Sequence, residues 1–514
     1  MVAYNEEQFV LNKFINNFSP YKDKRIVLYG TGKNTEAILR KCEQDFCIVG
    51  VMDVNREDEM FCGKKILSVK RIKNLCVDYI VMICLPVSED IVFERIRTFT
   101  EKEQIQVFNL DGVMMRSCRN EYRYERLADM DRKKLVGTER APALVQYTAY
   151  CDLEHKADTW IKKNMLNLFI KELLKNPSDI REDGRVFVAD SEKMGYLYWG
   201  PVFTGFLLWM VKAAMNDHCD IILFQSRDGY LLQKMYQILK HVYKEVQFPT
   251  DVYFLASRRS SMVPGIRTEE DIRIAARYSW YGTNENFMAR RFGVEIDGKE
   301  VPETSREEYA LKYKERIFER AEEERLHYKV YLDGLCIWQY RKAALIDTTA
   351  AGTVQTNLQH FMKLPMKGYY FLKRVSEIEE NNRIEFSSYY PVKPPYEIRE
   401  NVFAYFRFME LVLSSREATL LYFDQNGEPV YAEEKRGKEE KDVLECIQKG
   451  VLRYFKDICR MHFKWETLEL DRDYADEILG SMNCRNMVLG ESQIRDLVLE
   501  DYFLNTEKRV CERL

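Results

Sequence analysis

Short apolar runs alternate with amphipathic stretches over the first 115 residues. The runs at 26–29, 48–52, 79–85 and 106–109 have the length of buried strands, and the residues between them show the apolar spacing of helices. An alternation of strands and helices is typical of a parallel sheet with helices on its faces. The pattern predicts an α/β domain over residues 1–115.

The same alternation returns after residue 186, and charged residues fill the intervening segment 116–185. Charges at helical spacing indicate a solvated helical connector there. A second and larger α/β domain is expected over 186–514, with helical additions toward its C-terminus. Its expected strands, each followed by polar residues and a helical pattern, are 220–224, 252–256 and 343–346.

The longest apolar stretch, 196–211, is too short for a membrane span. A spanning helix needs about 20 apolar residues, and Gly200 and Pro201 interrupt this stretch. We expect a buried helix that begins near Pro201. The N-terminus also lacks the basic region and apolar run of a secretion signal. These features predict a cytoplasmic protein without a membrane span, for which peripheral contact with a membrane complex stays open.

Charge and cysteine usage narrow the function classes. The chain has 514 residues with 78 basic and 82 acidic side chains, a formal net charge of −4, so no overall field favours nucleic acid. Its 13 cysteines are scattered and include no Cys-x-x-Cys pair. We therefore expect reduced thiols, as in the cytoplasm, and neither a zinc site nor a disulfide scaffold.

A glycine turn follows the first expected strand. Gly30, Thr31 and Gly32 lie between this strand and a helix, where free backbone N–H groups can hold a phosphate. Asp53 follows the second strand, at the spacing from which an acid holds a ribose hydroxyl. Thr35 replaces the third glycine of the dinucleotide fingerprint. A nucleotide or nucleotide-sugar site is one interpretation, and a tight turn without a ligand is the other.

The segment 342–358 carries the most informative pattern of the chain. Four apolar residues lead to Asp347, small and hydroxylated residues follow, and a helix is expected from about Val354. Backbone N–H groups, threonine hydroxyls and the helix N-terminus together form a cradle for a phosphate. The residues expected in this loop are Thr348, Thr349, Ala350, Ala351, Gly352 and Thr353. Because a side chain at Gly352 would fill the phosphate space, we expect Gly352→Val to abolish phosphate binding without unfolding the protein.

This segment resembles the ribose-phosphate loop of type I phosphoribosyltransferases. In that family two adjacent acids hold the ribose hydroxyls, and the loop binds the 5-phosphate of phosphoribosyl pyrophosphate. The resemblance implies that Asp347 is the first acid and that residues 349–353 hold the phosphate. Thr348 stands where the family usually has its second acid.

The strand at 220–224 is followed by a loop that contains an arginine and an acid. Phosphoribosyltransferases have an arginine–glycine loop after an early strand, which receives pyrophosphate and its magnesium. The resemblance implies that Arg227 neutralises the leaving group and that Asp228 reaches Mg²⁺ through water. The residues of this loop are Ser226, Arg227, Asp228 and Gly229.

The strand at 252–256 leads to two arginines, Arg258 and Arg259, beside serine hydroxyls. Such a pair is suited to clamp a pyrophosphate. Because ligands of open α/β folds bind at the carboxyl ends of the strands, we expect the three loops to form one crevice. In the alternative interpretation, the arginines form structural ion pairs and the threonine-rich loop only caps a helix.

A longer series of segments resembles proteins of bacterial capsule and O-antigen loci, which are often labelled haloacid-dehalogenase-like hydrolases. The series spans roughly 190–420 and comprises YWGPVFTGFLLWM, LFQSRDGYLL, FLASRRS, ALIDTTAAGTVQ and FMELVLSS. Hydrolase chemistry needs an Asp-x-Asp pair on one loop, and neither Asp347 nor Asp228 begins one. The resemblance therefore favours a phosphoribosyltransferase-like domain. Residues 24–115 resemble the small Rossmann-like domains attached to sugar-modifying and polysaccharide-biosynthesis enzymes.

The resemblance implies a transferase that moves a ribofuranosyl phosphate from phosphoribosyl pyrophosphate to a glycan or sugar acceptor in surface polysaccharide biosynthesis. Arg227, Asp228 and Asp347 are the expected catalytic groups, with Mg²⁺ as cofactor. Glu410 is a candidate base for the acceptor hydroxyl, although a surface or paired core glutamate is the simpler interpretation. The alternatives are a sugar-phosphate phosphatase of the haloacid dehalogenase type and a non-catalytic nucleotide-binding scaffold of a glycan-assembly complex.

Overall fold

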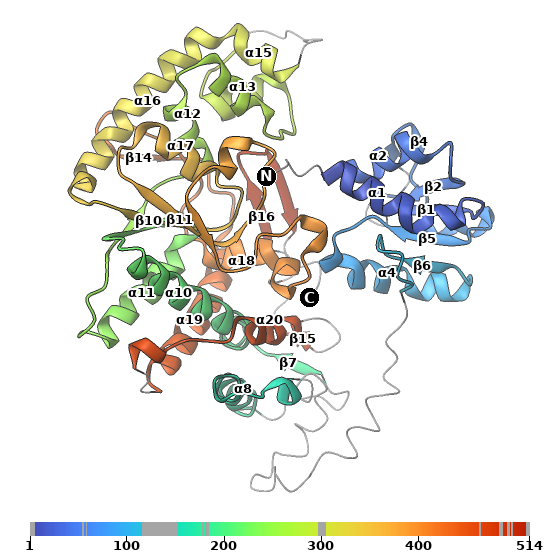
Figure 1. Cartoon of the computed structure of the whole chain (residues 1–514), viewed down its shortest axis with the longest axis horizontal. Coiled ribbons are helices and arrows are strands. Elements are labelled where there is room, and N and C mark those ends of the chain that lie inside the picture. The colour runs from blue at the N-terminus through green and yellow to red at the C-terminus, as the bar shows by residue number, and fades with distance from the viewer. Residues whose placement is uncertain are drawn as a thin grey trace, which may run out of the picture. The chain divides into compact units, whose positions relative to one another are not determined.

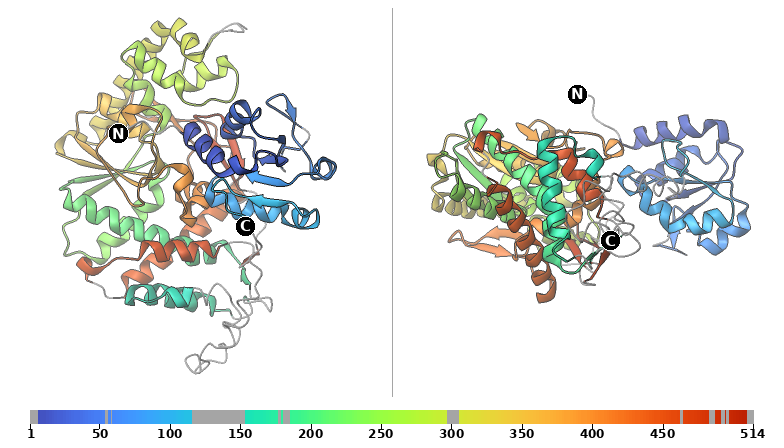
Figure 2. Two further views of the ribbon diagram at one scale, coloured as in Figure 1. Left: turned by 45° about the vertical axis from the view of Figure 1, so that its right-hand side comes forward. Right: turned by 90° about the horizontal axis from the view of Figure 1, so that it is seen from below.

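The computed structural model describes residues 6–509, apart from 54–55, 58, 116–152, 177–178, 180–184, 297–304, 462–463, 483–486, 491–493 and 495–496 (Figures 1 and 2). The chain divides into two compact units. Unit 1 comprises Met1–Asp131 and Lys393–Ala404, and unit 2 comprises Arg132–Val392 and Tyr405–Leu514. Parallel sheets accompanied by helices occur in both, so the expected α/β fold is confirmed. Most of the expected connector at 116–185 lies outside the described residues.

Unit 1 is built on a four-stranded parallel sheet in the order β2-β1-β5-β6. Its strands are β1 (Ile26–Tyr29), β2 (Ile48–Met52), β3 (Met60–Phe61), β4 (Lys64–Lys65), β5 (Tyr79–Met82) and β6 (Gln106–Phe108), and its helices are α1 (Glu6–Phe18), α2 (Lys33–Cys42), α3 (Val69–Ile72) and α4 (Glu89–Lys102). Ile26 and Leu28 pack with α1 and α2, whereas Val27 and Tyr29 pack with α4. Because both faces are covered, the strands are continuous apolar runs, which is why the sequence pattern located them.

A short segment from later in the chain belongs to unit 1. Tyr396 is buried in the core beside α1 and α2, and its hydroxyl accepts a hydrogen bond from Asn34 Nδ2 at 2.9 Å. Arg399 pairs with Asp111 at 2.8 Å. The expected domain at 186–514 is therefore interrupted by Lys393–Ala404. The buried residues of this segment, Tyr396, Ile398, Val402 and Phe403, follow neither a helical nor a strand period, so the sequence did not reveal this insertion.

Unit 2 is built on a five-stranded parallel sheet in the order β12-β11-β10-β8-β9. The strands are β8 (Ile221–Gln225), β9 (Thr250–Phe254), β10 (Ala343–Ala350), β11 (Met366–Lys373) and β12 (Phe386–Ser388). The first of them, β8, has β9 on one side and β10 on the other, so the strand order reverses between β8 and β10. In open α/β sheets a ligand crevice forms outside the carboxyl ends of the strands at this reversal.

Helices cover both faces of the unit 2 sheet. The helices are α8 (Trp160–Leu173), α9 (Ser191–Met194), α10 (Gly200–Asn216), α11 (Gly229–Val242), α12 (Arg258–Gly265), α13 (Glu269–Arg277), α14 (Asn284–Phe287), α15 (Arg306–Lys312), α16 (Lys314–Gly334), α17 (Thr353–Phe361), α18 (Phe406–Leu413), α19 (Lys438–Cys459) and α20 (Arg472–Gly480). On one face, Leu223 packs with Tyr328 of α16 and Leu358 of α17. On the other face, the ring of Phe224 lies 5.5 Å from that of Tyr236 in α11.

Three two-stranded ribbons complete unit 2. They are β7 (Val186–Val188) with β15 (Met487–Leu489), β13 (Leu420–Phe423) with β14 (Pro429–Tyr431), and β16 (Val498–Asp501) with β17 (Thr506–Arg509). The first pair is parallel and the other two are antiparallel. Residues of the β16–β17 hairpin lie near the carboxyl edge of the large sheet.

The last part of the expected connector is a packed helix of unit 2. Leu166 and Phe169 of α8 are buried. Glu172 on the same helix accepts two hydrogen bonds of 2.7 Å from Arg453 of α19. Residues 160–173 are therefore part of the second unit and not a solvated connector, because their apolar face is covered by other helices.

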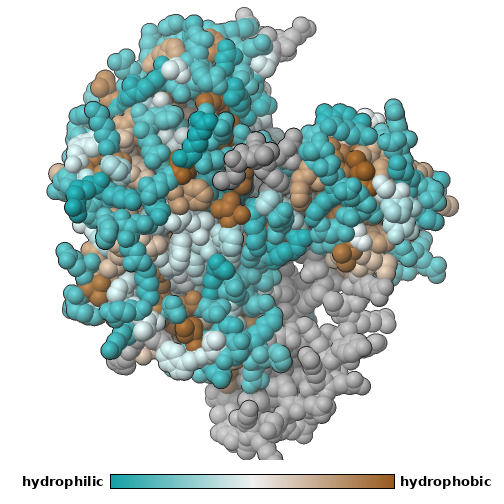
Figure 3. All heavy atoms as spheres, viewed as in Figure 1, coloured by the Kyte–Doolittle hydropathy of each residue, from teal (hydrophilic) through white to brown (hydrophobic). Residues whose placement is uncertain are grey.

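The longest apolar stretch forms one helical segment. It begins at Ser191 with α9, continues through a π-helical turn at Gly195–Trp199 and extends into α10, so the helix starts earlier than the expected Pro201. None of the described helices is long and apolar enough to cross a membrane. On the face shown in Figure 3, hydrophobic residues are scattered among hydrophilic ones.

Two glycines allow this segment to approach α19 closely. A Cβ at Gly195 would lie 1.9 Å from the carbonyl oxygen of Ile447, and a Cβ at Gly450 would lie 1.9 Å from that of Glu192. Real Cβ atoms do not come so near to backbone oxygen. Helix packing at this crossing therefore requires glycine on both sides.

Gly450→Val is expected to lower the free energy of unfolding by about 3 kcal/mol, because the new side chain would force two helix backbones apart. A urea titration followed by circular dichroism measures this change. Gly334→Val is the control, since nothing lies within 4 Å of a Cβ at the end of α16. Equal losses of stability in the two variants would show that the close approach has no special cost.

Candidate functional site

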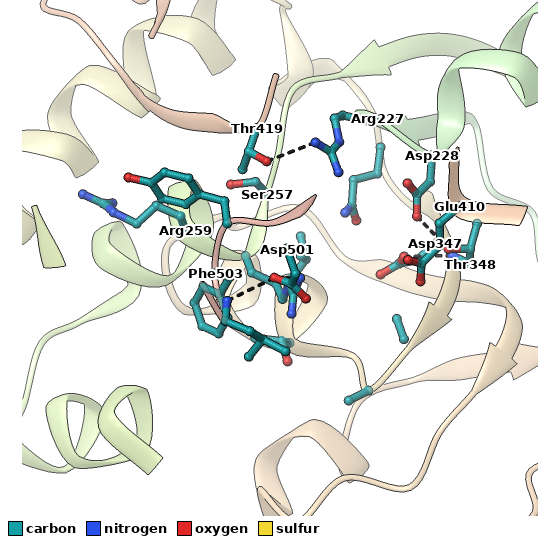
Figure 4. Close-up of a pocket in the computed structure, with 18 of the residues that line it drawn as sticks. Arg227, Asp228, Ser257, Arg259, Asp347, Thr348, Glu410, Thr419, Asp501 and Phe503 are labelled. Carbon is teal, nitrogen blue, oxygen red and sulfur yellow. Dashed lines mark hydrogen bonds and ion pairs between the residues drawn. The ribbon is translucent and has the colours of Figure 1, made fainter. Parts of the chain in front are cut away.

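A cavity of about 450 Å³ lies at the carboxyl edge of the unit 2 sheet. Its walls come from the loops after β8 and β10, the start of α12, helix α18, and the β16–β17 hairpin (Figure 4). Residues that follow three different strands thus line one cavity, as the sequence predicts. The predicted site residues among its lining are Ser226, Arg227, Asp228, Arg258, Arg259, Asp347, Thr348, Ala350, Ala351, Thr353 and Glu410.

Three carboxyl groups gather on one side of this cavity. Figure 4 shows Asp228, Asp347 and Glu410 close to one another and to Thr348. The hydroxyl of Thr348 donates a hydrogen bond to Asp228 Oδ2 at 2.6 Å, and its backbone N–H donates to Asp347 Oδ1 at 2.8 Å. Thr348, expected in the place of a second acid, therefore links the loop after β8 to β10.

Burial, together with repulsion between the negative charges, raises the pKa values of these carboxyl groups. Burial raises the pKa of Asp347 to about 7, and the negative charge of Asp228 adds to the increase. Burial and Asp228 likewise raise the pKa of Glu410 to about 8. The pKa of Asp228 is also raised by burial, although the hydrogen bond from Thr348 opposes the change. Several acids with raised pKa values in one cavity are typical of functional sites. Such a cluster lowers the stability of the fold, so it is found mainly where function requires it.

Glu410→Gln is expected to stabilise the protein more at pH 8 than at pH 5. The carboxyl pKa is higher in the folded chain than in the unfolded chain, so its ionisation destabilises the fold progressively as the pH rises from about 4.5 to 8. The neutral amide removes this loss. We expect the gain in melting temperature to exceed about 2 °C at pH 8. Melting curves at both pH values test the prediction, and a gain independent of pH would contradict it.

The arginines that line the cavity differ in their contacts, and they are Arg227, Arg258, Arg259, Arg374 and Arg407. Arg258 pairs with Asp501 of the hairpin at 2.8 Å. Arg227 Nη1 donates to Thr419 Oγ1 at 3.2 Å, and Figure 4 shows its guanidinium pointing away from the three carboxyl groups. Arg374 lines the cavity, and its side chain has no hydrogen bond or ion pair with the residues that the structure describes.

Arg259 is not free to clamp a pyrophosphate. It is 3% exposed and makes two hydrogen bonds of 2.8 Å to Glu324 of α16, which is itself 1% exposed. For this arginine the alternative of a structural ion pair is the correct interpretation. Breaking such a buried pair would leave an uncompensated charge, so a variant of Arg259 would report on folding before it reports on function.

The predicted phosphate loop is shorter than expected. Strand β10 continues to Ala350, and α17 begins at Thr353, which leaves only Ala351 and Gly352 between them. Ala350, Ala351, Thr353 and Val354 line the cavity, so the N-terminus of α17 contributes to its wall. Thr349 lies within β10, and its side chain is outside the described part of the structure.

Gly352 does not border the space expected for a phosphate. Its φ angle is 92°, and a Cβ there would lie 2.5 Å from Ile384 Cδ1 and 3.1 Å from the carbonyl oxygen of Asn381. The expectation that Gly352→Val would spare the fold is therefore wrong, because the substitution strains the backbone and overpacks the helix start. Gly229 is also structural, since its Cβ would lie 2.5 Å from the backbone carbon of Phe224.

The sequence did not predict two charged residues that line the cavity, Arg374 and Asp501. Arg374 directly follows β11, so a basic residue at a strand end was the signal that could have found it. Asp501 lies 243 residues from its partner Arg258. No local pattern near the C-terminus indicates that this hairpin reaches the cavity.

The predicted nucleotide loop of unit 1 has the conformation of a tight turn. Gly30 has a φ angle of 119°, and a Cβ there would lie 3.1 Å from the carbonyl oxygen of Ile83. Thr31 Oγ1 donates a hydrogen bond to Asp53 Oδ2 at 2.8 Å, and Gly32 precedes α2 with open space around it. Glycine is thus required at position 30 for the turn itself, and a nucleotide at this loop stays a prediction.

A protein-family model matches part of unit 1. Residues 22–117 match the family model described as C2185-like, N-terminal. No curated protein matches the chain.

Proposed function

We propose that the chain is a magnesium-dependent transferase that uses phosphoribosyl pyrophosphate to place a ribofuranosyl phosphate on a sugar or glycan hydroxyl. One observation carries the proposal. A single cavity at the reversal of strand order combines Arg227, Arg258 and Arg374 with the buried carboxyl of Asp347 and the N-terminus of α17. These groups complement the charges and hydroxyls of the donor.

The donor phosphates would be shared between two sides of the cavity. The 5-phosphate would lie at the start of α17, where the N-terminal backbone N–H groups point toward it. The hydroxyl of Thr353 donates to Tyr278 Oη at 3.3 Å and accepts from Asn381 Nδ2 at 3.2 Å, so it would reach the phosphate only in exchange for the bond to Tyr278. Arg374 and Arg258 would neutralise the pyrophosphate. Asp347 would accept hydrogen bonds from the ribose hydroxyls.

Magnesium would enter with the pyrophosphate and spread its negative charge. Within the described residues, no group of three or more His, Cys, Asp or Glu side chains is arranged to hold a metal ion. Mg²⁺ commonly keeps several waters and is bound through one or two carboxylates and substrate phosphates. The single carboxylate of Asp228, fixed by Thr348, fits that requirement.

The reaction would exchange one bond to the anomeric carbon for another. The acceptor oxygen would bond to C1 of the ribose while the bond from C1 to the pyrophosphate oxygen breaks, and the acceptor proton would pass to Glu410. The raised pKa of this carboxyl suits a general base that works near neutral pH. Positioning and charge stabilisation would supply most of the rate, since positive charge develops on the ribose.

Product analysis tests the proposal. The purified protein is incubated with Mg²⁺ and phosphoribosyl pyrophosphate, with and without a mixture of methyl glycosides, and separately with ribose 5-phosphate. Release of pyrophosphate that falls in Arg374→Met supports the transferase. Release of inorganic phosphate from ribose 5-phosphate would instead support the phosphatase, and donor binding without either product would support the scaffold.

The cellular setting follows from the same proposal. An acceptor in surface polysaccharide assembly would place the enzyme in the cytoplasm, where phosphoribosyl pyrophosphate is made, with peripheral contacts to a glycan-assembly complex. Unit 1 would then bind a nucleotide or nucleotide sugar at Gly30–Gly32, which a titration of the protein with such ligands tests.

A further inference from the structure

A second cavity of about 230 Å³ adjoins the first in unit 2. Four residues, Arg227, Thr419, Leu499 and Glu500, line both cavities. The hydrogen bond between Arg227 Nη1 and Thr419 Oγ1, 3.2 Å long, lies at this shared boundary. The two cavities therefore share a boundary at these residues.

Helix α18 contributes neighbouring residues to the two spaces. Glu410 lines the first cavity and Leu411 lines the second. Glu410 also lies close enough to Arg227 for their charges to interact. The candidate base is thus next to the boundary, where an oxygen atom entering from the second cavity would meet a ribose held in the first.

The second cavity is not built for another phosphate. Its lining includes five carboxylates and three cationic side chains. Lys435 pairs with Glu500 at 3.1 Å and with Glu507 at 2.7 Å, and Arg436 pairs with Glu434 at 2.7 Å. Apart from Arg227 at the boundary, the cations of the lining are therefore neutralised by carboxylates of the same cavity, so a phosphorylated ligand would meet an excess of negative charge.

The lining favours a ligand with many hydroxyl groups. Carboxylates accept hydrogen bonds, and the guanidinium of Arg227 donates them. None of the residues that line this cavity, all in the described part of unit 2, is aromatic. Its volume is below the roughly 300 Å³ of a drug-sized ligand site, which limits the occupant to a small ligand such as one sugar ring.

We propose that the second cavity is the acceptor subsite and that it binds one uncharged monosaccharide unit through its hydroxyl groups. The proposal rests on the transferase function above, because it places the acceptor oxygen between Arg227 and Glu410. It adds the chemical class of the acceptor terminus and its location between α18, the residues that flank the β13–β14 ribbon and the β16–β17 hairpin.

Filling the second cavity provides the test. Ala432, the residue directly after β14, lines this cavity and not the first. In Ala432→Trp the indole should occupy the sugar space and weaken sugar binding at least about tenfold, while the affinity for phosphoribosyl pyrophosphate with Mg²⁺ stays within about twofold of wild type. Val430→Trp, on the same ribbon but in neither lining, is the matched control.

The probes are methyl glycosides of glucose, galactose, mannose and N-acetylglucosamine, observed by saturation-transfer NMR with and without the donor. Saturation transfer in wild type and Val430→Trp that is lost in Ala432→Trp supports the subsite. Equal transfer in all three proteins, or none in wild type under either condition, overturns it. Donor affinity, measured by calorimetry on the same proteins, decides the transferase proposal separately.

The circular dichroism spectrum of Ala432→Trp shows whether this variant folds. If it does not fold, a milder variant keeps the test valid. Glu433 lines the second cavity and is exposed. Glu433→Gln should weaken sugar binding about threefold or more, because a charged acceptor binds a hydroxyl more strongly than a neutral one does. Unchanged sugar binding in this variant would count against the subsite.

Discussion

Asp347→Asn is expected to lower kcat/KM for pyrophosphate release at least about 100-fold. The carboxyl is 7% exposed, near the carboxyl end of β10, and lies beside Asp228. In the proposed complex it accepts hydrogen bonds from the ribose. Its negative charge stabilises the transition state more than the ground state, because positive charge develops on the sugar. The amide keeps the shape of the side chain but loses that charge.

The pH dependence distinguishes this role from a structural one. Burial raises the pKa of Asp347 to about 7, so kcat/KM of the wild type should rise with pH through that value. Asp347→Asn should lose this rise and keep only the one imposed by the Glu410 base, whose pKa is about 8. Asp220→Asn is the control, because Asp220 lies at the amino end of β8 and accepts hydrogen bonds from the backbone of Arg341 and Lys342. Comparable losses in both variants would contradict the assignment.

Arg374→Met is expected to weaken the binding of phosphoribosyl pyrophosphate about 30-fold or more. A hydrogen bond to a charged group contributes roughly 1.5–3 kcal/mol, and a guanidinium can make two such bonds to a phosphate. Arg374 lines the cavity without a hydrogen bond or ion pair among the described residues, so its donors are available. Equilibrium dialysis with labelled donor measures the affinity.

Salt dependence and a surface control support the interpretation. Because the contact is ionic, donor affinity of the wild type should fall with ionic strength, and the fall should be shallower in the variant. Arg383→Met provides the comparison. Arg383 is exposed, lies outside the cavity and pairs with Glu379, four residues before it in the sequence. If Arg374→Met binds the donor as wild type does, the pyrophosphate must lie elsewhere.

The sequence predicts the part of the site that is formed by residues at the ends of strands. Arg227 and Asp228 after β8, and Asp347 in β10, come together because parallel strands end at the same edge and these two strands are neighbours. Buried parallel strands are continuous apolar runs, which a single sequence displays clearly. The convergence of the loops was therefore foreseeable without knowledge of the helices between them.

The remaining features depend on contacts between distant parts of the chain. Arg259 is bound to Glu324, which lies 65 residues away on α16, and nothing near either residue indicates the pair. Tyr396 lies in the core of unit 1, although the chain on both sides of its short segment belongs to unit 2. Such tertiary contacts override local pattern, because one well-packed residue stabilises a segment without periodicity.

Conformation at Gly352 shows the limit of reasoning from residue type. Small residues after a strand predict a phosphate loop, and the loop does lie at the cavity. The structure nevertheless gives Gly352 a left-handed conformation with Ile384 and Asn381 close to its α-carbon. A phosphate site and tight packing would both require glycine at this position, and the sequence alone does not distinguish these two reasons.

Calorimetric titration of the full-length protein with phosphoribosyl pyrophosphate and Mg²⁺ tests the central claim most directly. The account predicts saturable binding of one donor per chain in wild type and a clear loss of affinity in Asp347→Ala. Absence of binding to folded wild type in the presence of Mg²⁺, with and without methyl glycosides, would contradict the claim that this cavity is a donor site. Equal affinity in wild type and Asp347→Ala would contradict it as well.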